Sequence, residues 1–233
     1  MTKKILITGA NGQLGHEMRN ALKGNNRFEC IFTDVAELDI CNAEAVKQII
    51  ADNHIDYIVN CAAYTQVDKA EDNAELCKKI NTDAVENLAR AAADYGARMI
   101  HISTDYVFNG RGYSPYTEDM PPDPQSVYGS TKLEGEKILT DICPESIIIR
   151  TAWLYSPYGN NFVKTMLHLG EEREELSVVA DQIGTPTCAA DLAQAILVIL
   201  QADTFVPGTY HFSDEGVCSW YDFTVTIHRL AGI

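Results

Sequence analysis

Short runs of apolar residues alternate with longer amphipathic segments through the first 150 residues of the chain. The runs are apolar at almost every position, which is typical of strands covered on both faces of a parallel sheet. The longer segments repeat apolar residues three and four positions apart, as helices that pack on such a sheet do. We expect strands at residues 5–7, 28–33, 57–59, 99–102 and 147–149, and helices at 14–22, 43–51, 74–95 and 128–139. This order predicts an α/β fold with a doubly wound parallel sheet and right-handed crossovers.

The pattern becomes less regular after Arg150. We expect helices at 162–169 and 190–201, strands at 176–180 and 209–212, and a last helix that begins near Ser219. Residues 110–125 contain four prolines and are expected to form an ordered loop. We therefore divide the chain into residues 1–150, which contain the sheet, and residues 151–233, which form mostly a smaller lobe. Interleaving of the two parts is left open.

The acidic composition limits the classes of partner. Asp and Glu outnumber Lys and Arg by 33 to 18, and the resulting net charge of −15 repels nucleic acid and anionic membrane surfaces. The seven cysteines form no CxxC pair, which favours reduced thiols over a disulfide framework or a zinc site. No apolar run approaches the ~20 residues of a membrane span, and the first apolar run meets a glycine too early for a signal peptide. These features predict a soluble cytoplasmic protein.

A glycine-rich turn, TGANGQLG at residues 8–15, follows the first expected strand and opens the first expected helix. Gly9 suits a tight turn, Gly12 allows a pyrophosphate to approach the backbone, and Gly15 allows close packing of the helix. The free amides of a helix N-terminus attract such an anion. The alternative is an ordinary connection between strand and helix. In this context we favour a Rossmann-type dinucleotide-binding domain over residues 1–150.

Asp34 ends the second expected strand, where a carboxylate can accept hydrogen bonds from the ribose of an adenosine. Such a contact favours NAD over its 2′-phosphorylated form. The alternative is a residue that only terminates the strand in a turn, so the choice between NADPH and NADH stays open. Asp39 and Ile40 follow at a position that suits contact with the adenine.

Tyr128 and Lys132 are spaced to share one face of a helix. A phenol has an ordinary pKa of about 10, and lowering that pKa by ~3 units requires about 4 kcal/mol. A nearby ammonium is a suitable source of this stabilisation. Thr104 lies at the end of an expected strand, where its hydroxyl can donate to a substrate carbonyl while Tyr128 supplies a proton. The alternative is a tyrosine and a lysine on the exposed face of an amphipathic helix.

Several longer segments accompany these motifs. They are VNCAAYT at 59–65, VDKAE at 67–71, HISTDYVF at 101–108, VYGSTKLEGEK at 127–137, RTAW at 150–153, GNNF at 159–162 and DQIGTPT at 181–187. Together with the glycine turn they resemble the extended short-chain dehydrogenases/reductases and, more narrowly, the dTDP-4-dehydrorhamnose reductase family. The resemblance covers essentially the whole chain and is far more specific than any single motif.

The resemblance implies an activity and a set of roles. The activity is NAD(P)H-dependent reduction of the C4 keto group of dTDP-4-dehydro-β-L-rhamnose to dTDP-L-rhamnose. Tyr128 is then the proton donor, Thr104 the partner of the carbonyl, and Lys132 the residue that binds ribose and lowers the pKa of the phenol. The cofactor-binding residues are Gly9, Gly12, Gln13, Leu14, Asp34, Asp39, Ile40, Ala63, Tyr64, Thr65, Tyr128 and Lys132, and the substrate-binding residues are Thr104, Asp105 and Trp153. The resemblance also allows for a homodimer.

Two departures from the family are visible. Its members usually continue well beyond the point that corresponds to Ile233, so we expect a substrate lobe that is truncated at its C-terminal end. Some members bind magnesium through glutamates, whereas one plausible matching position here is Ala190. We therefore assign no metal.

Two other functions remain as alternatives. One is a nucleotide-sugar epimerase or dehydratase of the same fold, although dehydratases usually carry a glutamate where this chain has Tyr106. The other is a non-catalytic regulatory subunit that binds a dinucleotide without turnover.

Overall fold

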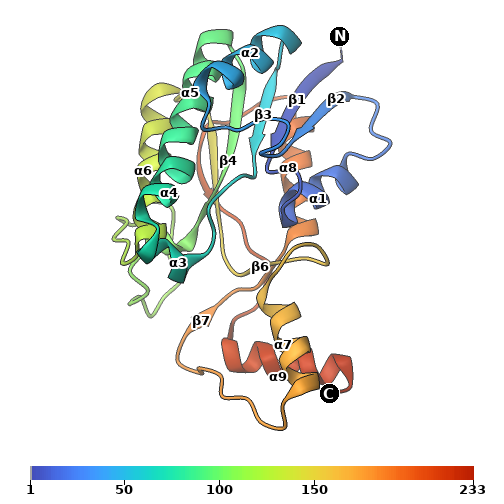
Figure 1. Ribbon diagram of the computed structural model, residues 1–233, viewed down its shortest axis with the longest axis vertical. Coiled ribbons are helices and arrows are strands. Elements are labelled where there is room, and N and C mark those ends of the chain that lie inside the picture. Colours follow the sequence, from blue (N-terminus) through green and yellow to red (C-terminus); the bar gives the residue numbers. More distant parts are fainter. Residues whose placement is uncertain (1) are drawn as a thin grey trace.

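The computed structural model, which describes residues 2–233, contains a six-stranded parallel sheet in the order β2-β1-β3-β4-β5-β9 (Figure 1). The strands are β1 Lys3–Thr8, β2 Phe28–Thr33, β3 Tyr57–Asn60, β4 Arg98–Thr104, β5 Ile147–Thr151 and β9 Gly208–His211. The chain moves outward from β1 to β2 and then crosses back to β3 on the other side of β1. Ligands of open α/β sheets bind at the carboxyl ends of the strands beside such a switch point. The predicted doubly wound sheet is confirmed.

Helices cover both faces of the sheet, and alternate residues of each strand pack against opposite layers. One face carries α2 Ala43–Asn53, α5 Ala84–Tyr95 and α6 Val127–Ile142, which pack on Leu6, Ile58 and Met99. The other face carries α1 Gln13–Ala21 and α8 Ala189–Gln201, which pack on strand residues that include Ile5, Ile7, Val59 and Ile100. This burial on both faces explains why the strands are apolar at almost every position.

A smaller lobe lies below the sheet in Figure 1. It contains α7 Phe162–Glu172, α9 Trp220–Ala231 and the antiparallel pair of β7 Ile183–Gly184 and β10 Cys218–Ser219. The short parallel pair of β6 Leu154–Tyr155 and β8 Thr187–Cys188 lies between the two parts. By contrast α8 packs on α1, and β9 pairs with β5 at the edge of the main sheet. Residues 151–233 are therefore interleaved with the sheet domain rather than confined to the lobe.

The expected helix at 74–95 is interrupted. It consists of α4 Ala74–Lys78, a π-helix at Lys79–Asp83 and then α5, and it is preceded by a short helix that was not expected, α3 Val67–Asp72. The π-helix brings Asn81 inward, where its backbone carbonyl meets Gly135 of α6 so closely that a Cβ on Gly135 would overlap it. The π-helix therefore coincides with close packing between Asn81 and α6. The spacing of apolar residues in the sequence does not reveal this contact.

The expected strand at 176–180 is wrong, because these residues form an irregular segment. A strand needs a partner with a free edge. The segment makes one backbone contact of this kind, from the amide of Tyr221 to the carbonyl of Val179 at 3.1 Å. The prolines at 110–125 do produce the expected loop without regular helix or strand. Among residues 2–233, no helix has both the length and the apolar character needed to cross a membrane.

Candidate active site

The glycine turn leaves no room for side chains at two of its three glycines. Gly9 has a φ of +64°, and a Cβ there would lie 2.6 Å from the backbone nitrogen of Ala62. A Cβ on Gly15 would overlap the carbonyl oxygen of Gly9, so α1 packs directly on the turn. Gly12 is the N-cap of α1 and provides no side-chain cap. The amides at the start of α1 are therefore available to an anion, as the sequence predicts.

A cavity of about 510 Å³ opens beside this turn. It lies between the glycine turn, the loop after β2, the loop after β3 and the start of the π-helix. Its lining includes six of the residues predicted to bind the cofactor, namely Gly9, Gly12, Asp34, Asp39, Ile40 and Ala63. Leu76, Lys79 and Ile80 line the same cavity, and sequence reasoning missed them because α4 and the π-helix reach the site only through tertiary packing.

The Asp34 carboxylate ties the glycine turn to the end of β2. Its Oδ2 accepts a hydrogen bond from the backbone amide of Asn11 at 2.9 Å, and its Oδ1 accepts one from Val35 at 2.8 Å. Asp34 therefore acts as a residue that terminates the strand in a turn, which is one of the two roles that the sequence allows. A contact with ribose stays a prediction.

Gln13 and Leu14 lie outside the lining of the cavity. Gln13 accepts a hydrogen bond from the Asn161 side chain at 2.9 Å, which joins the glycine turn to the N-cap residue of the lobe helix α7. Leu14 is 4% exposed and packs in the core between α1 and the sheet. Its side chain is therefore part of the core, and a contact with the cofactor, which stays a prediction, falls to its backbone.

Asn81 holds the loop after β3 in place. Its Oδ1 accepts from the amide of Tyr64 at 2.8 Å, and its Nδ2 donates to the carbonyl of Tyr64 at 3.1 Å. The Tyr64 side chain packs against a small cluster that contains Tyr128 and Cys77, whereas Thr65 is exposed. The loop that borders the cavity is thus connected to the helix that carries Tyr128.

Tyr128 lies buried in the first turn of α6, whose N-cap is Ser126. Tyr106 packs edge-on against its ring, with the centroids 5.5 Å apart. Burial raises the pKa of Tyr128, and a side-chain hydrogen bond with Thr104 opposes that shift in part. Without a bound cofactor, desolvation therefore outweighs the other contributions to the pKa of Tyr128, and the lowering of this pKa by Lys132 stays a prediction.

Thr104 and Asp105 follow at the carboxyl end of β4. The hydroxyl of Thr104 donates to Asp105 Oδ1 at 3.1 Å and accepts from the amide of Tyr106 at 3.2 Å. Burial raises the pKa of Asp105 to about 6, although the hydrogen bond with Thr104 acts in the other direction. Thr104 and Asp105 are thus hydrogen-bonded at the carboxyl end of β4 beside Tyr128, and a role for these groups in binding a carbonyl stays a prediction.

Lys132 is almost completely buried one helical turn after Tyr128. Its Nζ donates to the carbonyl of Ile102 at 2.7 Å and lies 3.2 Å from His101 Nε2. Burial lowers the pKa of Lys132 to about 8, and the charge of Glu136 opposes this shift. The ammonium therefore gives up its proton more easily than an exposed lysine does.

Glu136 extends the polar face of α6 by one more turn. It forms a buried ion pair with Arg150 at 2.7 Å and accepts a hydrogen bond from Ser103. These contacts anchor α6 to β4 and β5 and so fix the position of Tyr128 and Lys132. The spacing of residues 128, 132 and 136 is the sequence signal for this face, although it does not identify the partners.

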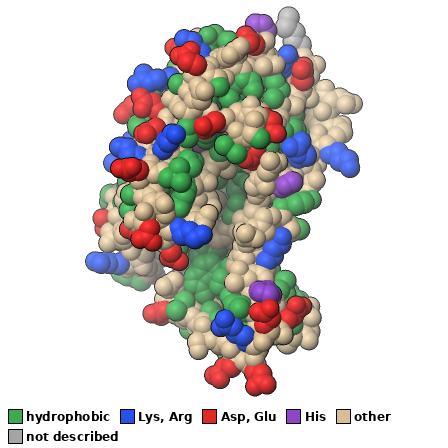
Figure 2. Space-filling model, viewed as in Figure 1, with side chains coloured by type: hydrophobic (Ala, Val, Ile, Leu, Met, Phe, Trp, Pro, Cys, Tyr) green, Lys and Arg blue, Asp and Glu red, His purple; other side chains and the backbone are tan. Residues whose placement is uncertain are grey.

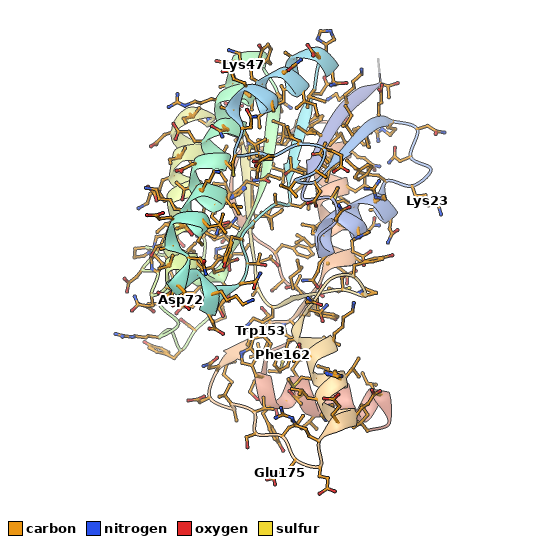
Figure 3. All side chains as sticks on the ribbon, in the orientation of Figure 1. Lys23, Lys47, Asp72, Trp153, Phe162 and Glu175 are labelled. Carbon is orange, nitrogen blue, oxygen red and sulfur yellow. The ribbon has the colours of Figure 1, made fainter. Side chains whose placement is uncertain are left out.

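Trp153 lies where the chain leaves the sheet for the lobe (Figure 3). Its φ of +48° is unusual for a bulky residue. Its ring stacks on Trp220 of α9 with centroids 3.4 Å apart, and the ring of Phe162 packs against Trp220 with centroids 4.3 Å apart. Figure 2 shows hydrophobic side chains gathered where the body meets the lobe. Contact of Trp153 with a sugar stays a prediction.

Comparison with known proteins identifies relatives over nearly the whole chain. A family model described as the RmlD substrate binding domain matches residues 3–233. A dTDP-4-dehydrorhamnose reductase of Aggregatibacter actinomycetemcomitans is 44% identical over 228 residues, which cover 96% of this chain and 78% of that protein. The crystal structure of a dTDP-4-dehydrorhamnose reductase from Clostridium acetobutylicum is 52% identical with a TM-score of 0.95, and the match covers 99% of this chain and 81% of that chain. A dTDP-4-dehydrorhamnose reductase from Bacillus anthracis, solved in complex with NADP, is 43% identical with a TM-score of 0.96 and coverage of 100% and 82%.

Proposed function

The chain belongs to the RmlD substrate binding domain family, and we infer from this premise that it is an NAD(P)H-dependent oxidoreductase. It reduces the C4 keto group of dTDP-4-dehydro-β-L-rhamnose to give dTDP-L-rhamnose. The observation that supports this chemistry best is the meeting of Tyr128 and Thr104 at the carboxyl end of β4. A proton donor and a second hydroxyl at one point are what reduction of a carbonyl requires.

The residues present fit a dinucleotide. A Cβ on Gly9 or Gly15 would overlap neighbouring backbone, and the neighbouring cavity of about 510 Å³ has carboxylates and apolar side chains in its lining. Gly12 and the first amides of α1 would hold the pyrophosphate, and Asp34, Asp39 and Ile40 would hold the adenosine. When bound, NADPH or NADH supplies the hydride.

We assign the proton transfer to Tyr128 and the orientation of the carbonyl oxygen to Thr104. In reduction the phenol must be protonated before the reaction, and the raised pKa of Tyr128 keeps that proton in place. The hydroxyl of Thr104 donates either to Asp105 or to the substrate oxygen, so binding of the carbonyl requires Thr104 to release Asp105. Asp105 and Trp153 are assigned to the nucleotide sugar, and Lys132 to the ribose of the cofactor.

We also place the enzyme in the cytoplasm. All seven cysteines have free thiols, which suits a reducing compartment. The net charge of −15 makes nucleic acid an unsuitable partner.

The test follows the absorbance of reduced nicotinamide with the dTDP-linked 4-keto-6-deoxy sugar as substrate, and compares the wild type with Tyr128→Phe. Loss of the phenol proton is expected to lower kcat by about 10²–10⁴-fold. Affinity for the cofactor should stay within about twofold, because the ring remains. Tyr113→Phe is the matched control, since Tyr113 is fully exposed.

Three results would contradict the proposal. Wild-type turnover in Tyr128→Phe would remove Tyr128 from its role. Conversion of the sugar without net consumption of reduced cofactor would indicate an epimerase or dehydratase. Tight binding of the cofactor without turnover in the wild type would indicate a regulatory subunit.

A further inference from the structure

Four buried polar side chains form a continuous row of contacts that runs from β1 through β3 and β4 to α6. Thr8, Asn60, His101 and Lys132 are each no more than 1% exposed. Thr8 and Asn60 are register partners in β1 and β3, and Asn60 and His101 are register partners in β3 and β4. The contacts are 2.6 Å from Thr8 Oγ1 to Asn60 Oδ1, 3.0 Å from Asn60 Nδ2 to His101 Nδ1, and 3.2 Å from His101 Nε2 to Lys132 Nζ. Each donor in a fully buried row of this kind needs a matching acceptor, because an unpaired polar group is costly there.

The backbone fixes the direction of the Asn60 amide. The amide N–H of Ala62 donates to Asn60 Oδ1 at 3.2 Å, and a backbone N–H has no other role than donor. The hydroxyl of Thr8 donates to the same oxygen. The Nδ2 group of Asn60 therefore faces His101, and an amide nitrogen only donates.

The direction of Asn60 determines the tautomer of His101. Because His101 Nδ1 accepts from Asn60, the single proton of the neutral ring must lie on Nε2. Burial and the charge of Lys132 hold the pKa of His101 well below its ordinary value, so the ring stays neutral. His101 therefore presents an N–H donor to Lys132.

An ammonium cannot accept this hydrogen bond, because all its positions are donors. A neutral amine can accept it through its lone pair. The groups that face Lys132 from other directions are the carbonyl of Ile102, Glu136 one turn along α6 and Cys77 of α4. Glu136 and Cys77 favour the ammonium. Desolvation and the His101 donor favour the amine.

We propose that His101 is a positioning residue that stabilises the neutral amine of Lys132, and that Asn60 holds His101 in the required tautomer. The proposal rests on the proposed function, because it takes the Lys132 ammonium as the form that binds the ribose of the cofactor. When that ammonium loses its proton to water, an N–H bond of Lys132 breaks and ammonium becomes amine. The lone pair left on Nζ then accepts from His101 Nε2–H.

The first test needs no turnover. Long-range ¹H–¹⁵N NMR of the wild type without added ligand reports which ring nitrogen of His101 carries the proton, and His101→Gln identifies the signals. We expect the Nε2–H tautomer throughout pH 6–8, a range chosen around the ordinary titration of histidine. A proton on Nδ1 would overturn the inference whether or not the enzyme is active.

The second test reverses the tautomer with Asn60→Asp. The new carboxylate still accepts from Thr8 and Ala62, but it also accepts from His101 Nδ1–H, so Nε2 becomes an acceptor for the Lys132 ammonium. The pKa of Lys132 should rise, and the alkaline limb of the pH profile of kcat should move upward by roughly one unit. His101→Gln should move it in the same direction, because a carbonyl oxygen can replace the donor.

His168→Gln, an exposed histidine on α7, is the matched control and should leave the profile unchanged. An unchanged alkaline limb in active Asn60→Asp would contradict the inference while leaving the reductase assignment in place. Absence of turnover in the wild type would contradict the reductase assignment, and the NMR result would still decide the tautomer. If Asn60→Asp fails to fold, the wild-type NMR decides alone.

Discussion

At the scale of single residues, the site contains a carboxylate that the fold disfavours. Asp105 sits in a largely buried position beside Thr104 and Tyr106, and burial raises its pKa to about 6. Its hydrogen bond with Thr104 and the nearby amides offset only part of the desolvation. A carboxylate that reduces stability in this way is typical of a functional site. The function proposed above for Asp105 is contact with the substrate.

Asp105→Asn should therefore stabilise the protein above pH 6 while lowering its activity. The folded pKa of about 6 exceeds the unfolded value of about 4, so the native state binds the proton more tightly. The unfavourable contribution is absent below about pH 4, grows as the pH rises, and is complete above about pH 6. We expect the free energy of unfolding in urea to increase by about 1–3 kcal/mol at pH 7.5 and by much less at pH 4.5.

Asp203→Asn, at an exposed position, should change stability little at either pH. An equal gain for Asp105→Asn at both pH values would show that the stabilisation does not come from the charge. No gain at pH 7.5 would show that the Asp105 carboxylate is well solvated in the native state.

Residue types in motifs could be predicted from the sequence, whereas their electrostatic state could not. The position of Thr104 at a strand end follows from local pattern, and so does the closeness of Gly15 to the turn. The direction of the Tyr128 pKa shift depends on burial by segments distant in the sequence, including Tyr106 and Cys77. The tautomer of His101 depends on the direction of the Asn60 side chain, which only the assembled sheet determines.

At the scale of elements, the strands of the main sheet were predictable because burial on both faces leaves an unbroken apolar run. The failures occur where a partner decides the outcome. Val178 and Val179 resemble a strand but have no sheet edge beside them, and Asn81 lies in a π-helix because of its packing against α6. Residues 208–211 form a strand because β5 offers a free edge.

The glycine turn allows binding and stability to be separated with two substitutions. Gly12 has an extended backbone with a φ of −77°, and a Cβ there would lie 3.2 Å from the carbonyl of Gly9, so a side chain fits after a small shift. Gly12→Val should thus fold but block the pyrophosphate, with a loss of cofactor affinity of about tenfold or more. Gly15→Ala forces α1 away from the turn and should lower the free energy of unfolding by about 1–3 kcal/mol.

Isothermal titration with NADPH and urea unfolding, performed on both variants, check this separation. Unchanged cofactor affinity in Gly12→Val would contradict the placement of the pyrophosphate at this turn. Wild-type stability in Gly15→Ala would contradict the close contact between α1 and the turn.

At the scale of the whole molecule, the chain crosses between sheet and lobe several times. It enters the lobe after β5, returns for α8 and β9, and enters the lobe again for α9 (Figure 1). Asn161 at the start of α7 bonds to Gln13 of the glycine turn, so the lobe is tied directly to the proposed cofactor site. The expected division at residue 150 follows sequence order, whereas the pairing of β5 with β9 and the packing of α8 on α1 return parts of residues 151–233 to the sheet.

The stack of Trp153 on Trp220 is the contact that tests how this lobe is positioned. Trp220→Leu removes the ring that covers one face of Trp153, whose backbone is already in an unfavourable conformation, and releases Phe162 as well. Since the proposed cofactor cavity is lined by the sheet domain, we expect cofactor affinity within about twofold of wild type and a KM for the sugar nucleotide raised about tenfold or more. The chain has two tryptophans, so near-ultraviolet circular dichroism should lose the signal of the stacked pair. Tyr221→Ala, on the same helix but half exposed, should leave both the cofactor affinity and the KM for the sugar nucleotide unchanged. Equal losses of cofactor and substrate affinity in Trp220→Leu would mean that the aromatic stack supports the whole active site rather than its substrate side.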